Sequence, residues 1–438
     1  MVHEHCVIRE GALSVAPGEY RKIWGNRTPL LIADHNTWKV AGKSLRDMFL
    51  KDGFVEVPVY IFADEGMVYA DDRHVAEVRS QIEGKDVVPV AIGSGTLNDL
   101  VKRASFECGK DYMVVATAPS VDGYTATGAA ITVDGFKITL DCPPPALVIA
   151  DTASLREAPY PMIASGYGDL AAKITAGADW LIADQLGIEP IVPSVWDMVQ
   201  RPLRSQLSDP KGLAARESAV IDGLFLGLVQ VGYAMQRYKD SRPASGADHL
   251  MSHVWEMDHL CVDGVAVSHG FKVAIGTLCS TAMMTELLGM SAAGIEQAYA
   301  GKPGMDWDGR LEEIKGLLEG DASTESTLKA CRIKFQDAGK LVERRKAIVG
   351  SWETIKARIR QQIIPFNQLQ MMFKVAGCPC QPAEIGLTRA ELARGMYKAQ
   401  LIRKRYTVLD LAYETGLMDH LVGVVAYGDG YFNRFLSA

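Results

Sequence analysis

Several features that would assign this chain to a common protein class are missing. No long basic run accompanies the net charge of -7, so nucleic-acid binding, which needs clustered lysine and arginine, is not expected. The eight cysteines are scattered, which excludes a disulfide framework and a zinc-ribbon pattern. Only Cys378 and Cys380 lie close together, and one such pair is more typical of a loop than of a redox or metal clip.

Targeting and membrane signals are also missing from the pattern. The N-terminal residues have no basic segment followed by an apolar stretch, so no signal peptide is expected. The longest apolar run, residues 219–235, is interrupted by Asp222, Gln230 and three glycines. We interpret it as a buried helix, since a membrane span needs about 20 predominantly apolar residues. The expectation is a cytoplasmic protein with no membrane span.

The composition that is present, 48% hydrophobic and 23% charged, is typical of a globular protein, and 438 residues are enough for two domains. Up to about residue 150, short apolar runs alternate with helix-like stretches, which predicts a parallel sheet built from βαβ units. Pro58 cannot donate to a strand ladder, so pairing of the second run is expected near or after it. The four predicted strands are residues 30–33, 55–62, 87–92 and 112–117.

Helical patterns dominate after residue 151, just beyond a run of three prolines that ends at Pro145. We therefore expect an α/β nucleotide-binding domain of residues 1–150 and an all-α C-terminal domain of residues 151–438. A cleft between two such domains is the usual place for a ligand site. Pro365 should break the fifth predicted helix. The predicted helices are residues 168–182, 217–237, 250–260, 277–288, 354–375 and 389–405.

Two segments could hold a nucleotide. Gly93-Ser94-Gly95-Thr96 follows the third strand and precedes a helical pattern, where glycine permits close approach and a helix N-terminus attracts phosphate. It is not the full G-x-G-x-x-G fingerprint, and a plain turn fits equally well. The segment from Thr117 to Tyr124 follows the fourth strand, at the edge where open sheets bind ligands. Its Thr117, Ser120 and Asp122 offer hydrogen-bonding groups, although an Asp-Gly turn is an equal alternative.

The most specific chemistry lies further along the chain. His249 and His253 are four residues apart, on one face if the stretch is helical, and His259 and His269 follow. Two or three imidazoles with one carboxylate, for which Asp169 is suitable, make a plausible divalent-metal site. A lone histidine is more often structural, but four of nine within this segment are harder to dismiss.

Five ordered segments together resemble the sn-glycerol-1-phosphate dehydrogenase family, particularly its bacterial branch. This family belongs to a superfamily with dehydroquinate synthases, glycerol dehydrogenases and iron-type alcohol dehydrogenases. The similarity extends from about residue 30 to about residue 419, and it implies a dehydroquinate synthase-like fold. The segments that carry it are residues 92–99, 117–124, 166–173, 248–253 and 268–270.

The resemblance implies a metal-dependent, reversible reduction of dihydroxyacetone phosphate to sn-glycerol 1-phosphate with NAD or NADP. The implied metal is one divalent ion, with zinc or nickel favoured, and the partner is a phosphorylated triose. A homodimer is a base-rate expectation. The resemblance assigns Asp169, His249 and His269 to the metal, Asp122 and His253 to the substrate, and Gly93, Ser94, Gly95, Thr96, Leu97, Thr117 and Ser120 to the cofactor.

Some positions depart from relatives. Ala126 stands where the family commonly has a serine near the cofactor, so Thr125 or Thr127 would have to supply that hydroxyl. Lys173 stands where iron-type alcohol dehydrogenases carry a further histidine. It is also a candidate for the substrate phosphate, although a helical lysine is more often solvated or salt-bridged.

Three alternative functions stay open: a glycerol dehydrogenase, a lyase of the dehydroquinate synthase kind, and a binding protein without catalytic activity. Dehydroquinate synthases typically begin their metal triad with glutamate, whereas this chain has Asp169. Asp64 and Glu65 follow the second predicted strand and would accept from a ribose 2′-hydroxyl, which favours NAD over NADP.

Overall fold

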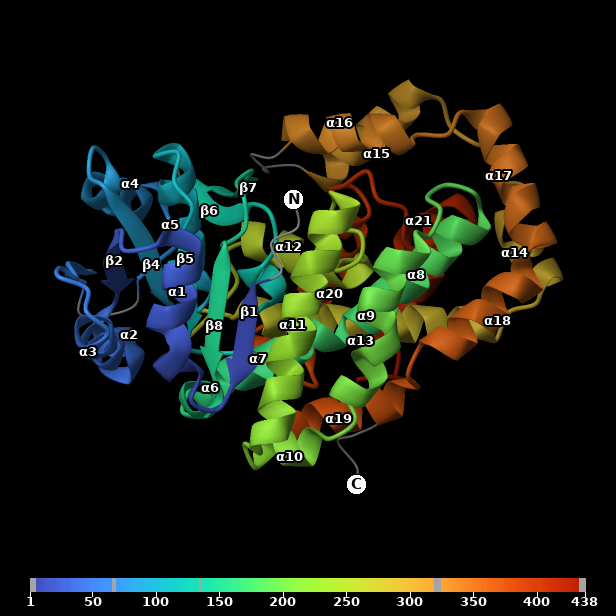
Figure 1. Cartoon of the computed structure of the whole chain (residues 1–438). Coiled ribbons are helices and arrows are strands. Elements are labelled where there is room, and N and C mark those ends of the chain that lie inside the picture. Colours follow the sequence, from blue (N-terminus) through green and yellow to red (C-terminus); the bar gives the residue numbers. More distant parts are fainter. Residues whose placement is uncertain (1–4, 65–67, 134–135, 319–323, 433–438) are drawn as a thin grey trace. The chain divides into compact units, whose positions relative to one another are not determined.

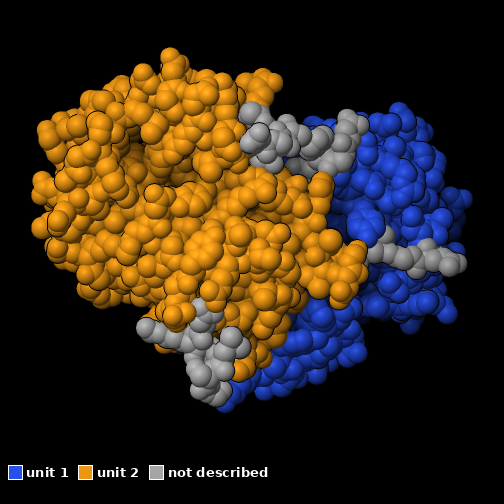
Figure 2. All heavy atoms as spheres, turned by 180° about the vertical axis from the view of Figure 1, so that it is seen from behind, with its two compact units in different colours: residues 1–170, 204–240 blue, residues 171–203, 241–438 orange. Residues whose placement is uncertain are grey.

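The computed structural model describes residues 5–64, 68–133, 136–318 and 324–432. The chain forms two compact units, coloured separately in Figure 2. Unit 1 contains Met1–Leu170 and Arg204–Asp240, and unit 2 contains Ala171–Leu203 and Ser241–Ala438. Each unit therefore takes two stretches of the chain.

Unit 1 is built on a six-stranded sheet with the order β1-β8-β5-β4-β2-β3, in which every neighbouring pair is parallel (Figure 1). The central strands are buried along their whole length, as expected when helices cover both faces of a parallel sheet. In the second predicted strand, β3 begins at Val59, and Pro58 contributes only its carbonyl, which accepts the Leu31 N–H over 3.0 Å. The six strands are β1 (Cys6–Arg9), β2 (Thr28–Ala33), β3 (Val59–Ile61), β4 (Val87–Gly93), β5 (Met113–Ala116) and β8 (Leu147–Asp151).

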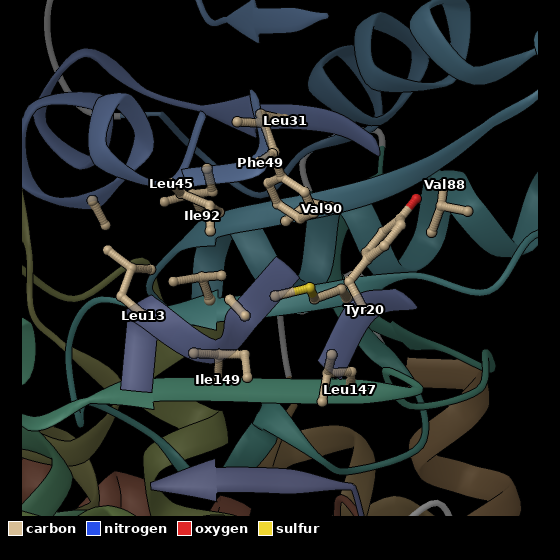
Figure 3. Close-up of a cluster of buried hydrophobic side chains, with 14 of the residues drawn as sticks. Leu13, Tyr20, Leu31, Leu45, Phe49, Val88, Val90, Ile92, Leu147 and Ile149 are labelled. Atoms are coloured by element: carbon tan, nitrogen blue, oxygen red, sulfur yellow. The ribbon is translucent and has the colours of Figure 1, made fainter. Parts of the chain in front are cut away.

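Figure 3 shows part of the core on one face of this sheet, where side chains of Leu31, Val90 and Ile149 meet the helical Tyr20 and Phe49. The Tyr20 and Phe49 rings lie edge to face, with centroids 5.2 Å apart. The described helices of unit 1 are α1 (Ala16–Trp24), α2 (His35–Thr37), α3 (Lys43–Lys51), α4 (Asp72–Ile82), α5 (Gly95–Glu107), α6 (Thr152–Arg156), α7 (Tyr160–Ala171), α10 (Pro210–Ala214) and α11 (Ser218–Tyr238). Shorter elements are η1 (Ala12–Val15), η2 (Trp38–Gly42), η3 (Asp122–Tyr124) and the hairpin β6 (Ala129–Val133) with β7 (Phe136–Leu140).

Unit 2 is predominantly helical, and its centre is the packing of α12 against α13. The break expected at Pro365 is present, because α18 ends at Gln362 and α19 begins at Phe366. The helices are α8 (Lys173–Gln185), α9 (Pro193–Gln206), α12 (Ala247–Met257), α13 (His269–Leu288), α14 (Ala292–Tyr299), α15 (Trp307–Leu317), α16 (Thr324–Lys334), α17 (Ala338–Gly350), α18 (Trp352–Gln362), α19 (Phe366–Ala376), α20 (Arg389–Ala399), α21 (Val408–Glu414) and α22 (Met418–Val422). Shorter elements are η4 (Pro382–Ile385), η5 (Gly423–Tyr427) and the hairpin β9 (Cys261–Val262) with β10 (Val265–Ala266).

The expected α/β fold class with a helical C-terminal part is confirmed, and the contacts group two later stretches of the chain with residues 1–150. Residues 151–170 and 204–240 belong to unit 1. The reason is packing, since α11 contacts η3, α6 and β1, all elements of unit 1. A hairpin also interrupts the expected all-α region.

Two of the described helices are long and apolar enough to cross a membrane by length and composition, α11 and α13. Their mean hydropathies are 1.5 and 1.2, and most of each is buried inside the fold. Core helices pass the same test, so this is weak evidence for a span.

Candidate functional site

The glycine-containing segment of unit 1 connects β4 to α5. β4 ends at Gly93, Ser94 is the N-cap of α5, and the helix begins at Gly95. A Cβ on Gly95 would lie 2.7 Å from the side chain of Val121, and one on Gly93 would overlap Leu97. The turn therefore needs glycine at both positions. Ser94 makes no side-chain cap, and the N–H groups of the first turn of α5 are available to an anion.

The second predicted cofactor segment lies at the same edge of the sheet. β5 is the neighbour of β4, and the Thr117 N–H donates to the Gly93 carbonyl over 3.1 Å. Thr117 and Ser120 are buried, as is Leu97 on α5, whereas Ser94 and Thr96 are half-buried.

Helix α7 holds this second segment in place. A Cβ on Gly166 would overlap the Pro119 carbonyl oxygen, so the helix and the loop touch through the glycine. Ser165 Oγ donates to the Ser120 carbonyl over 3.3 Å. The Asp122 N–H donates to Asp169 Oδ2 over 2.9 Å, which brings together two residues that are 47 positions apart in the chain.

Of the two threonines beside Ala126, Thr125 already uses its hydroxyl within the fold. The Thr125 hydroxyl is buried and donates to the Val229 carbonyl over 2.8 Å, so it joins the loop to α11. Thr127 is exposed. The missing serine hydroxyl is therefore not replaced by Thr125.

In unit 2, His249 is held by a buried carboxylate. Asp248 Oδ1 lies 2.6 Å from His249 Nδ1 and also accepts the His249 N–H, and Thr175 donates to Oδ2 over 2.6 Å. Burial opposes ionisation of Asp248, but these hydrogen bonds outweigh it and hold its pKa below the ordinary value. Burial and the Asp248 carboxylate raise the pKa of nearby Asp179 to about 7. Asp179 also accepts the Ala247 N–H, which fixes the start of α12.

A second carboxylate, Glu256, contacts two more histidines. Its Oε1 lies 2.7 Å from His269 Nδ1, and its Oε2 lies 3.2 Å from His253 Nδ1. The His249 and His269 ring centroids are 5.4 Å apart, and His253 is 6.4 and 6.0 Å from them. Burial lowers the pKa of His253 to about 4, so this ring is neutral near pH 7.

The remaining polar residues of the segment are placed differently. His259 is exposed in a turn with a φ of 53°, so the histidine cluster has three members from this segment. Lys173 is fully buried at the start of α8, and its Nζ lies 3.5 Å from His249 Nε2. A solvated lysine, the commoner case, is therefore excluded at this position.

Sequence analysis missed Asp248, Glu256 and Asp179. Two signals were available for the first two: Asp248 is adjacent to His249, and Glu256 follows His253 by three residues on the same helical face. Asp179 had no comparable signal, because its role depends on long-range contacts.

Unit 1 contains another group of possible metal ligands, Asp64, His74 and Glu77. His74 lies 3.3 Å from Asp64 and 2.7 Å from Asp71, and the Arg73 guanidinium contacts both Asp64 and Glu77. These carboxylates thus already have cationic or hydrogen-bonding partners. Glu65, the second acidic residue of the NAD prediction, lies outside the described residues.

A cavity of about 470 Å³ in unit 2 contains none of the predicted site residues. Cys378 and Cys380 line it as buried thiols that form no disulfide, and burial raises the pKa of Cys380 to about 12. This is the loop expected for the close cysteine pair. The other lining residues are Phe271, Gln370, Lys374, Gly377, Pro379, Gln381 and Glu384.

Comparisons with known proteins agree on one superfamily. Residues 7–159 match the family model described as iron-containing alcohol dehydrogenase. Relatives named glycerol-1-phosphate dehydrogenase [NAD(P)+] include those of Halalkalibacterium halodurans, 35% identical over 58% of this chain and 64% of that protein, and Bacillus licheniformis, 30% identical over 90% of this chain and 84% of that protein. The match to the Halalkalibacterium protein spans less than two thirds of its length.

Solved structures with the same fold are more distant in sequence. The match to glycerol dehydrogenase from Schizosaccharomyces pombe has a TM-score of 0.58 at 16% identity, and it covers 98% of this chain and 93% of the Schizosaccharomyces chain. The match to iron-containing alcohol dehydrogenase from Corynebacterium glutamicum has a TM-score of 0.59 at 15% identity, and it covers 97% of this chain and 95% of the Corynebacterium chain. At these identities the likeness shows the fold alone.

Proposed function

We propose that this chain, which belongs to the glycerol-1-phosphate dehydrogenase family, catalyses the reversible NAD(P)-linked reduction of dihydroxyacetone phosphate to sn-glycerol 1-phosphate. The observation that carries the proposal is the 30% identity to a relative of that name over 90% of the chain. The paired, carboxylate-supported histidines of α12 and α13 give the proposal a chemical basis.

The proposed metal ligands are Asp169, His249 and His269, for one divalent ion. The donor set fits the ion: one nitrogen of His249 lies within 4.8 Å of one nitrogen of His269, and imidazole suits zinc, nickel and iron. A divalent ion supplies Lewis-acid chemistry, which stabilises negative charge on the C2 oxygen of the substrate. Zinc or nickel is the proposed identity.

The chain's own residues then have three tasks. The first turn of α5 and the loop after β5 bind the cofactor through Gly93, Ser94, Gly95, Thr96, Leu97, Thr117 and Ser120. Asp122 accepts a substrate hydroxyl, which its position beside Asp169 in unit 1 supports. His253, neutral near pH 7, accepts or passes a proton at Nε2. The buried Lys173 is a candidate cation for the substrate phosphate.

The proposal also covers the cofactor preference and the oligomeric state. NAD is the proposed preference, through Asp64, although Arg73 and His74 already contact that carboxylate. A cytoplasmic homodimer is proposed on family and base-rate grounds.

The deciding experiment follows NADH oxidation by absorbance with dihydroxyacetone phosphate, before and after chelation and metal restoration. The expected result is metal-dependent oxidation whose product is inert to an sn-glycerol-3-phosphate-specific enzyme. Oxidation coupled only to an unphosphorylated substrate would indicate a glycerol dehydrogenase. Turnover of a sugar phosphate without net NADH change would indicate a lyase. No turnover of any substrate with restored metal would favour a binding protein.

A further inference from the structure

Glu256 has contacts that the proposed reaction does not use. It lies on the same face of α12 as His249 and His253, three residues beyond the latter. Its side chain is only 6% exposed, yet each carboxylate oxygen reaches a different imidazole, His269 at 2.7 Å and His253 at 3.2 Å. The ammonium of Lys272 lies 3.5 Å from Oε1. A buried carboxylate that reaches two imidazoles from separate elements joins the end of α12 to the first residue of α13.

These contacts determine which ring nitrogen carries hydrogen. A neutral imidazole has one N–H and one nitrogen with a lone pair, and an ionised carboxylate can only accept a hydrogen bond. The nitrogen that faces Glu256 is Nδ1 in both rings, so Nδ1 must be the donor. The lone pair is then on Nε2, the nitrogen left to ligate a metal or to accept a proton.

We propose that Glu256 is a positioning residue that holds His253 and His269 together in the Nδ1–H form, so that both present Nε2 to the same site. Asp248 does the same for His249 alone. One carboxylate therefore links a proposed metal ligand to a proposed substrate residue. The chemical consequence for the metal rests on the proposed function, but the tautomer assignment does not.

The first test uses metal-free protein labelled with ¹⁵N-histidine, in which long-range ¹H–¹⁵N spectra distinguish the two tautomers. The wild type should show His249, His253 and His269 with hydrogen on Nδ1. In Glu256→Gln, the side-chain amide has one accepting oxygen and one donating nitrogen, so it can serve only one of the two Nδ1–H groups. At least one of His253 and His269 should change tautomer. His249 should not change, which makes it an internal reference.

The second test measures zinc affinity by competition with a chromogenic chelator. Glu256→Gln should weaken zinc binding by about 10- to 100-fold, the usual effect of losing a carboxylate behind a histidine ligand. The matched control is Glu353→Gln, which removes a carboxylate that is 75% exposed and paired with Lys356 on α18 of the same unit. The control should leave both zinc affinity and tautomers unchanged.

Either measurement can overturn the proposal. Nε2–H forms of His253 and His269 in the wild type would refute it without any variant, even if Glu256→Gln failed to fold. Unchanged tautomers and zinc affinity in a folded Glu256→Gln would refute it as well. A wild type that has the expected tautomers and binds zinc, but does not reduce dihydroxyacetone phosphate, would support the role of Glu256 and refute the proposed reaction.

Discussion

Replacing Gly166 by alanine should show how strongly α7 supports the loop that follows β5. A Cβ at this helical position would overlap the Pro119 carbonyl oxygen, and it would also lie 3.3 Å from the Leu228 side chain. A backbone oxygen cannot move away without its chain, so the loop that carries Ser120 and Asp122 must shift with it. Alanine should therefore displace two proposed ligand-binding residues.

The magnitude follows from two opposing contributions. Alanine in a helix interior is favoured over glycine by roughly 0.5–1 kcal/mol. Overpacking a well-packed site costs about 1–3 kcal/mol, and a rigid backbone neighbour places Gly166→Ala at the upper end of that range. We expect a net loss of about 2–2.5 kcal/mol in the free energy of unfolding.

The matched control is Gly223→Ala on α11 of the same unit, where a Cβ would meet nothing within 4 Å. This variant keeps the helix-propensity gain and should be more stable than the wild type by about 0.5–1 kcal/mol. Chemical denaturation measures the free energy of unfolding of both variants. The KM for NADH tests whether the loop after β5 has moved, and it should rise in Gly166→Ala but not in Gly223→Ala. Equal stability of the two variants with equal KM would refute the argument that the glycine is required for this contact.

Three further predictions concern the metal and pH. His249→Ala should abolish turnover while circular dichroism stays unchanged, and wild-type activity would refute its assignment as a ligand. Adding zinc at 100 times its Kd to metal-free wild type should stabilise the fold by about 2.7 kcal/mol, seen as a higher melting temperature; an unchanged temperature would contradict metal binding. Burial raises the pKa of Glu414 to about 7, so its contribution to stability is present below pH 4.5 and is lost as the pH rises through 7. As the pH rises from 4.5 to 8, the free energy of unfolding of Glu414→Gln should therefore increase by about 2–3 kcal/mol relative to that of the wild type. Denaturation experiments measure this difference, and the same pH dependence of stability in both proteins would contradict the prediction.

Sequence patterns predicted β2, β3, β4 and β5 of the six-stranded sheet, where burial is local, but they missed β1 and the equally buried β8. The run around Val90 is apolar on both faces, which is typical of a central parallel strand, and it is buried throughout in the structure. Pro58 has no backbone N–H to donate, which predicted that the strand would begin near or after it, and β3 begins at Val59. The division into units was harder, because α11 has the apolar composition of any core helix and nothing local indicates which core receives it.

In the candidate site too, the features that depend on local spacing could be predicted from the sequence, and those that depend on long-range packing could not. The spacing of His249 and His253 predicted a shared helical face, and both lie on α12. The contact between Asp122 and Asp169 depends on how α7 packs against the loop, which no spacing in the chain encodes. For Glu256, spacing along the chain could predict its place on the helical face. Its contact with His269 could not be predicted in this way, because it depends on the turn of the β9–β10 hairpin.

Close packing explains why the histidines of unit 2 can be held by so few groups. A Cβ on Gly276 of α13 would overlap the Asp248 carbonyl of α12, so the two helix backbones touch beside His249. Gly246 likewise allows Asp179 to approach the start of α12, where it accepts the Ala247 N–H. Rigid backbone contact sets the positions of the helices, and carboxylates then fix only the rotation and tautomer of each ring. On this argument, a change at Gly276 should disturb the position of His249, whereas a change at Glu256 should disturb the rotation and tautomer of His253 and His269 and, through them, zinc affinity.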